Sequence, residues 1–82
     1  MNKKQIEKIV VDYFKKRNPE KKSFDLDEDI FAQGYVDSLG TLDMICKFEE
    51  KFNIKFETED MENIDFKIIS GLVNIIYQKT QE

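Results

Sequence analysis

Apolar residues recur at helical spacing in three separate segments of this 82-residue chain, and no other feature of the sequence limits the fold as much. The segments are residues 3–17, a second one that begins at 37 or 38 and ends at 52 or 53, and residues 67–79. Helices of this length can bury such stripes only against one another. A shorter helix is predicted over residues 57–63, with Thr58 as its cap. The sequence therefore predicts an all-α four-helix bundle, with three main helices and a short third one.

The stripes follow the i, i+3, i+4, i+7 spacing of one helix face. Their members are Ile6, Ile9, Val10, Tyr13 and Phe14 in the first segment; Leu42, Ile45, Phe48 and Phe52, with Met44 beside them, in the second; and Ile68, Ile69, Leu72, Val73, Ile75 and Ile76 in the last. Gly71, inside the last stripe, predicts close packing of that helix.

A long loop, residues 19–36, joins the first two helices. Loops of this length without regular structure are uncommon and often functional. We expect Phe24, Leu26, Ile30 and Phe31 to hold the loop against the core, the last two in a short helical turn. The run DLDED at residues 25–29 is spaced like the start of a calcium loop. However, Ile30 stands where that loop needs glycine, and Val36 where it needs glutamate, so no metal site is predicted.

The size and composition predict a single domain over residues 1–82. Its one cysteine, Cys46, is expected on a helix surface or half-buried, and cannot form an internal disulfide or a paired-cysteine metal site. No apolar run approaches the roughly 18 residues of a membrane span. The N-terminus also lacks the apolar stretch of a signal peptide. We therefore expect a cytoplasmic protein without a membrane span. We also expect it to be a monomer.

The net charge of -4 is unevenly distributed along the chain. Residues 1–22 contain eight Lys or Arg against three Asp or Glu, whereas residues 23–82 contain five against fourteen. One interpretation is two solvated faces of different charge. The other is that the acidic part, which includes Ser38, meets basic partner surfaces through electrostatic steering. Nucleic acid is not an expected partner, because phosphate contacts need clustered basic groups near the working site.

The chain contains no histidine, which removes the usual general base and any Ser-His or Cys-His nucleophile pair. A small serine hydrolase with a lysine base remains formally possible. However, Lys47 lies far along the predicted second helix from Ser38. No catalytic residue is predicted, and the chain is not expected to be an enzyme.

Ser38 has two interpretations at the start of the second helix. It can cap the helix, as Asp37 also can, because either side-chain oxygen can accept a free N–H of the first turn. It can instead be a site of attachment. Gly40, in the same turn, costs roughly 1 kcal/mol relative to alanine. That glycine either allows close approach of a ligand or partner, or is unselected.

The surrounding sequence resembles the acyl and peptidyl carrier proteins over nearly the whole chain. The likeness lies in FAQGYVDSL at residues 31–39, in Leu42-Asp43, and in FEEKFNI at residues 48–54. The resemblance implies that Ser38 receives 4′-phosphopantetheine from coenzyme A through a phosphopantetheinyl transferase. It also implies that Asp37 contributes to recognition by the transferase and that Leu39 lies beside the arm. The acidic positions that partner enzymes would read are Asp43, Glu49 and Glu50.

Two departures from the fatty-acid carriers indicate a specialised pathway. Tyr35 and Val36 separate Gly34 from Asp37, where many fatty-acid carriers have one residue, and this spacing looks more like stand-alone carriers such as D-alanyl carrier proteins. Gly40 also replaces an acidic residue common in fatty-acid carriers.

The resemblance therefore implies a stand-alone acyl carrier protein with an acyl or aminoacyl thioester as cargo. A D-alanyl or other aminoacyl cargo is favoured over a fatty acid. The expected partners are the transferase, a loading ligase, and downstream transferases or synthases of fatty-acid, polyketide, nonribosomal-peptide or cell-wall synthesis. The alternative function is a helical protein-interaction domain that is never modified.

Overall fold

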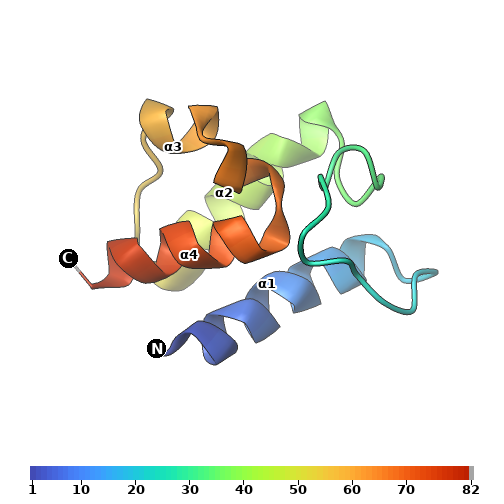
Figure 1. Ribbon diagram of the computed structural model, residues 1–82, viewed down its shortest axis with the longest axis horizontal. Helices are drawn as coiled ribbons and strands as arrows, with labels where there is room; N and C mark the ends of the chain where they lie inside the picture. Colours follow the sequence, from blue (N-terminus) through green and yellow to red (C-terminus); the bar gives the residue numbers. More distant parts are fainter. Residues whose placement is uncertain (82) are drawn as a thin grey trace.

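The computed structural model describes residues 1–81 and folds them into four α-helices and one short 3-10 helix, η1 (Figure 1). The elements are α1 (Lys3–Arg17), α2 (Ser38–Phe52), α3 (Thr58–Glu62), η1 (Ile64–Lys67) and α4 (Ile69–Thr80). The described part of the chain contains no strand, only an isolated bridge between Asp29 and Ile68. The predicted all-α fold, with a long loop between the first two main helices and a short third helix, is confirmed.

Local capping sets both ends of α1. Asn2 and Gln5 form a reciprocal capping box, in which each side chain accepts the other residue's backbone N–H at 2.8 Å. At the other end the buried Asn18 donates from its side-chain amide to the carbonyls of Phe14 and Tyr35, both at 2.9 Å. Asn18 therefore ties the end of α1 to the loop that leads into α2.

The core-facing side of α2 differs from the predicted stripe. Met44, Phe48 and Phe52 are buried, but Leu42 is 69% exposed, so its predicted core position is wrong. Leu42 lies two positions from Met44, which is about 200° of helix rotation. It therefore cannot point inward once Met44 and Phe48 do.

The long loop is held to the core by apolar side chains and by backbone hydrogen bonds. Ile30 is fully buried, as expected, and a single turn follows it without becoming a helix. The N–H of Ile30 donates to the carbonyl of Lys67 at 2.8 Å, and the N–H of Ser70 donates to that of Leu26 at 2.8 Å. The loop thus contacts the junction between η1 and α4, far from it in sequence.

The C-terminal part of the chain corrects two further predictions. Glu57, rather than Thr58, occupies the N-cap position of α3, and its N–H donates to the Asp60 carboxylate at 2.6 Å. The last helix begins at Ile69, because Ile68 is extended and separates η1 from α4. Gly71 packs closely, as predicted: a Cβ there would overlap the backbone of Asp65. No helix within residues 1–81 is long and apolar enough to cross a membrane.

Candidate functional site

Ser38 is the first residue of α2, and its side chain is exposed. Asp37 caps this helix instead: its carboxylate accepts the N–H of Gly40 at 2.7 Å, and its carbonyl accepts the Thr41 hydroxyl at 3.0 Å. Within the described residues, the Ser38 hydroxyl has no hydrogen-bond partner. The choice between the two predicted caps is therefore settled for Asp37, and the serine oxygen is left free to react.

A hollow of about 400 Å³ opens beside Ser38. Its walls come from the end of α1, the loop before α2, and the start of α2; they are formed by Arg17, Asn18, Phe31, Gly34, Tyr35, Val36, Asp37 and Ser38. Gly34 has a φ of 73°, a left-handed turn conformation that suits glycine. Arg17 contributes the only side-chain cation among these lining residues.

The two residues between Gly34 and Asp37 anchor the loop that presents Ser38. Tyr35 and Val36 are each 5% exposed. The Tyr35 hydroxyl accepts the N–H of Asp25 at 2.9 Å, and the backbone carbonyl of Tyr35 accepts a hydrogen bond from the side-chain amide of Asn18. The longer spacing seen in the sequence therefore places two buried side chains directly before the helix cap.

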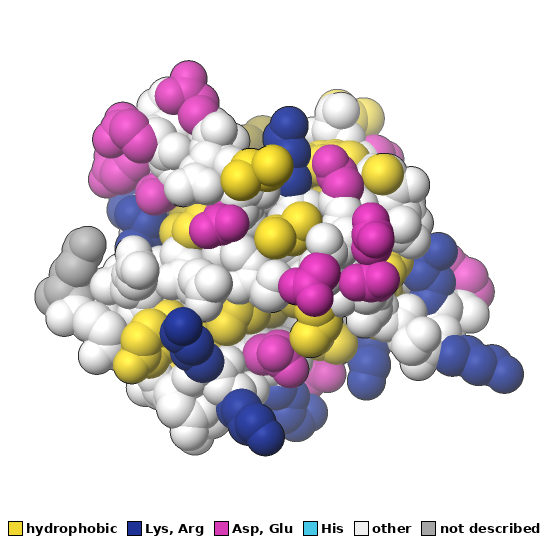
Figure 2. Space-filling model, viewed as in Figure 1, with side chains coloured by type: hydrophobic (Ala, Val, Ile, Leu, Met, Phe, Trp, Pro, Cys, Tyr) yellow, Lys and Arg dark blue, Asp and Glu magenta, His cyan; other side chains and the backbone are white. Residues whose placement is uncertain are grey.

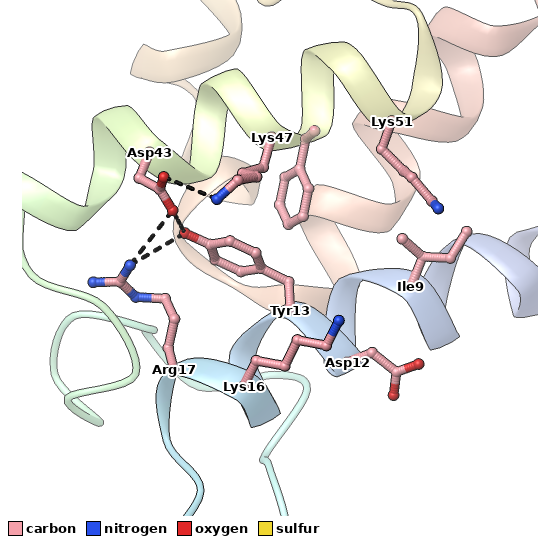
Figure 3. Close-up of a pocket in the computed structure, with 9 residues that line it drawn as sticks. Ile9, Asp12, Tyr13, Lys16, Arg17, Asp43, Lys47 and Lys51 are labelled. Atoms are coloured by element: carbon pink, nitrogen blue, oxygen red, sulfur yellow. Dashed lines mark hydrogen bonds and ion pairs between the residues drawn. The ribbon is translucent and has the colours of Figure 1, made fainter.

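A second groove, of about 510 Å³, runs between α1 and α2 (Figure 3). Tyr13 lies at its centre and donates its hydroxyl to Asp43 at 2.8 Å. Asp43 also accepts Lys47 at 3.1 Å and lies 3.5 Å from Arg17. Burial, together with the hydrogen bond to Asp43, raises the pKa of Tyr13 to about 12. The hydrogen bonds from Tyr13 and Lys47 hold the pKa of Asp43 below its usual range.

We expect Tyr13→Phe to raise the pKa of Asp43 toward its ordinary value. The lowered pKa of Asp43 stabilises the fold at pH values above the ordinary pKa of an aspartate. This contribution to stability disappears as the pH falls through the lowered pKa. Loss of the Tyr13 hydroxyl should therefore narrow the acidic pH range over which ionised Asp43 stabilises the fold. An NMR titration of the Asp43 carboxyl carbon measures the shift. Tyr77→Phe, on α4, is the control; an Asp43 pKa that is equal in the two variants would contradict the expectation.

The three acidic residues predicted to meet partners have different surroundings. Asp43 is held by the groove residues, and the Glu49 carboxylate accepts the N–H of Phe56 at 2.8 Å while half-buried. Glu50 is exposed, and within residues 1–81 its carboxylate has no partner. Asp43 and Glu50 lie seven positions apart, on one side of α2, whereas Glu49 points elsewhere.

Three large apolar side chains of α2 and η1 are exposed on the surface. Leu39 is 89% exposed and Leu42 is 69% exposed, both on α2, and Ile64 of η1 is 77% exposed. Only the position of Leu39 in the serine motif indicated an outward side chain. Figure 2 shows acidic side chains over α3 and across the middle of this face, and basic side chains mainly along α1 with acidic ones among them.

Residues 1–81 contain no candidate metal site and one free cysteine. No group of three or more His, Cys, Asp or Glu side chains there could hold a metal ion. Cys46 is exposed on α2, one of the two placements expected for it. The Ser38 hydroxyl is exposed and lies beside a hollow.

Comparison with known proteins identifies the family. A family model described as the phosphopantetheine attachment site matches residues 4–76. The chain belongs to this carrier-protein family. The D-alanyl carrier proteins of Streptococcus pyogenes serotypes M5, M49 and M1 are each 35% identical to it over 68 residues, 83% of this chain and 86% of the relative. No solved structure matches the chain.

Membership of the family decides between the two functions considered from the sequence. The protein is a carrier with a covalently attached 4′-phosphopantetheine arm, not an unmodified interaction domain. When bound, the arm supplies a terminal thiol that holds an acyl or aminoacyl group as a thioester. Proteins of this family interact with phosphopantetheinyl transferases and ligases and are not themselves catalytic.

The residues at the start of α2 suit such a group. Its phosphodiester is anionic, and the hollow beside Ser38 offers the guanidinium of Arg17. The N-terminal end of a 15-residue helix also favours negative charge. The Ser38 side chain is exposed, so an arm attached there would extend into solvent.

Proposed function

We propose that Ser38 carries the 4′-phosphopantetheine arm and that the protein presents an aminoacyl thioester, D-alanine, to partner enzymes. One observation carries the site: the Ser38 hydroxyl is exposed and unbonded because Asp37 caps α2. In the loading reaction the Ser38 oxygen forms a bond to phosphorus and the pyrophosphate bond of coenzyme A breaks. Adenosine 3′,5′-bisphosphate leaves, and the hydroxyl proton passes to a base of the transferase.

The D-alanine cargo is supported by the relatives and by the loop. The streptococcal proteins named D-alanyl carrier protein align over most of both chains. The two-residue spacing of Tyr35 and Val36, which resembles stand-alone carriers, is formed by two buried anchors. The hollow at Ser38 is small and mainly polar, so it does not offer an apolar shelter for a long acyl chain.

The remaining roles form part of the same proposal. Asp37 and Leu39 flank the modified serine and would meet the transferase, and Asp43, Glu49 and Glu50 would meet the loading ligase and later enzymes. Glu50, exposed and unpaired in the described structure, is the acidic residue most open to such contacts. The protein is proposed to act as a non-catalytic monomeric carrier domain over residues 1–82. Its cytoplasmic location stays a prediction.

Loading in two stages tests this function. The protein is incubated with coenzyme A and several phosphopantetheinyl transferases, and its intact mass should rise by one phosphopantetheine group. The modified protein is then offered D-alanine, L-alanine and a fatty acid with ATP and ligases that activate each of them. We expect D-alanine to be transferred preferentially. No mass increase with any transferase would refute the carrier assignment, and preferential loading of the fatty acid would refute the cargo.

A further inference from the structure

Arg17 lies between the groove of α1 and α2 and the hollow at Ser38. It is the last residue of α1, and its side chain lines both the groove between α1 and α2 and the hollow at Ser38. The other cations of the groove, Lys16, Lys47 and Lys51, do not reach that hollow. Arg17 is therefore the one basic side chain of the groove that also lines the hollow at Ser38.

Among the described residues, one terminal nitrogen of the Arg17 guanidinium makes only long contacts, and the other makes no hydrogen bond. Its Nη1 lies 3.5 Å from both the Tyr13 hydroxyl and the Asp43 carboxylate, which is long for a hydrogen bond. Its Nη2 has no hydrogen-bond partner within the described residues. Figure 3 shows this second nitrogen directed away from Asp43. The side chain is 32% exposed, so it can change partners without crossing the core.

Gly40 brings this cation against the first turn of α2. A Cβ at residue 40 would overlap Nη2 of Arg17 and would also press on Val36. Glycine destabilises a helix relative to alanine. At residue 40, two positions beyond Ser38, it leaves room for the guanidinium. The start of a helix carries partial positive charge and disfavours a cation unless an anion lies nearby. In the unmodified protein the Asp43 carboxylate lies 3.5 Å from the guanidinium, and Asp37, which lines the same hollow as Arg17, is engaged as the cap.

We propose that Arg17 is a positioning residue for the phosphodiester on Ser38, with Nη2 donating to a non-bridging phosphate oxygen. This inference rests on the proposed attachment at Ser38. The guanidinium matches phosphate in charge and in hydrogen-bond geometry. The contact restricts the directions in which the arm leaves α2, and it weakens the long contact of Arg17 with Asp43. Gly40 provides the space that the guanidinium needs.

The test compares what modification does to the stability of three proteins. Wild type, Arg17→Gln and Lys16→Gln are each unfolded in urea before and after loading by the transferase, with loading checked by intact mass. Lys16→Gln removes one positive charge from the neighbouring position, which lines the groove but not the hollow at Ser38. We expect modification to raise the equilibrium constant for folding about fivefold more in wild type and Lys16→Gln than in Arg17→Gln. A purely structural Arg17 would lower the stability of both forms equally.

Two further measurements complete the test. The ³¹P signal of the modified protein should move in Arg17→Gln and stay in place in Lys16→Gln. In the wild type, the side-chain N–H signals of Arg17 should shift on modification, which answers the question even if Arg17→Gln does not fold. An equal gain in all three proteins, or Arg17 signals that do not change, would overturn the inference while leaving the carrier function intact. Absence of the mass increase would overturn the proposed function, and this inference with it.

Discussion

Ser38→Ala will abolish loading by phosphopantetheinyl transferase, with no mass increase under conditions that fully convert the wild type. The substitution removes the oxygen that would form the bond to phosphorus, so the expected loss is complete. The fold should be retained, because the Ser38 side chain is exposed and makes no hydrogen bond within the described residues. We expect the free energy of unfolding to change by less than about 0.5 kcal/mol. Intact-mass spectrometry and urea unfolding measure the two effects separately.

The matched control is Ser23→Ala. Ser23 is also exposed, and it lies in the long loop away from any helix start. Ser70 is a poorer control, because its hydroxyl donates to Asp27 at 2.8 Å and its removal would disturb the loop. Ser23→Ala should load like the wild type. Loading of Ser38→Ala would move the attachment to another residue, and loss of loading in Ser23→Ala alone would do the same.

Phe48→Ala will lower the free energy of unfolding by about 3–5 kcal/mol. Phe48 is 1% exposed, and its ring centroid lies 5.1 Å from that of Tyr13 and 6.1 Å from that of Phe52. Its removal would leave a cavity between α1 and α2, where the groove begins. At roughly 0.05–0.15 kcal/mol per residue, a chain of this length is stable by only about 4–12 kcal/mol. The variant should therefore unfold at far lower urea concentration, as followed by circular dichroism.

Leu42→Ala provides the contrast, because both residues belong to the stripe predicted from the sequence. Leu42 is 69% exposed, so we expect its truncation to change the free energy of unfolding by no more than about 0.5 kcal/mol. The pair therefore measures which face of α2 packs inward. If the two substitutions proved equally costly, the orientation of α2 described here would be wrong.

The boundaries of the two longest helices could be predicted from the sequence because their signals are local. The apolar spacing and the basic last turn mark α1, and the Asp37-Ser38 pair marks the start of α2, within a few residues of each element. The short α3 was also expected, although its cap was misplaced by one residue. The break at Ile68 was missed, since a continuous apolar run does not reveal that one residue pairs with Asp29 in a distant loop.

At the start of α2, likewise, the sequence could not show which side chain caps the helix. The sequence by itself determined that an aspartate and a serine stand at a helix start within a carrier-like pattern, and this pattern is the basis for predicting Ser38 as the site of attachment. Which oxygen caps the helix required the geometry, because both side chains can form the same bond. The bond from Gly40 to Asp37 decided it and left the serine free.

Only the tertiary structure shows which residues of α1 contact the part of α2 that follows Ser38. Asp43 belongs to the predicted docking residues, yet its carboxylate accepts a hydroxyl from Tyr13, thirty positions earlier in the chain. Arg17 reaches Gly40 across the interface of α1 and α2, and nothing near either residue in the sequence indicates that contact. Helical periodicity specifies which residues share a face, but not how far a helix rotates about its axis or which helix it meets. That rotation follows from packing the whole core at once, and here it buries Phe48, exposes Leu42 and brings a guanidinium to the start of α2.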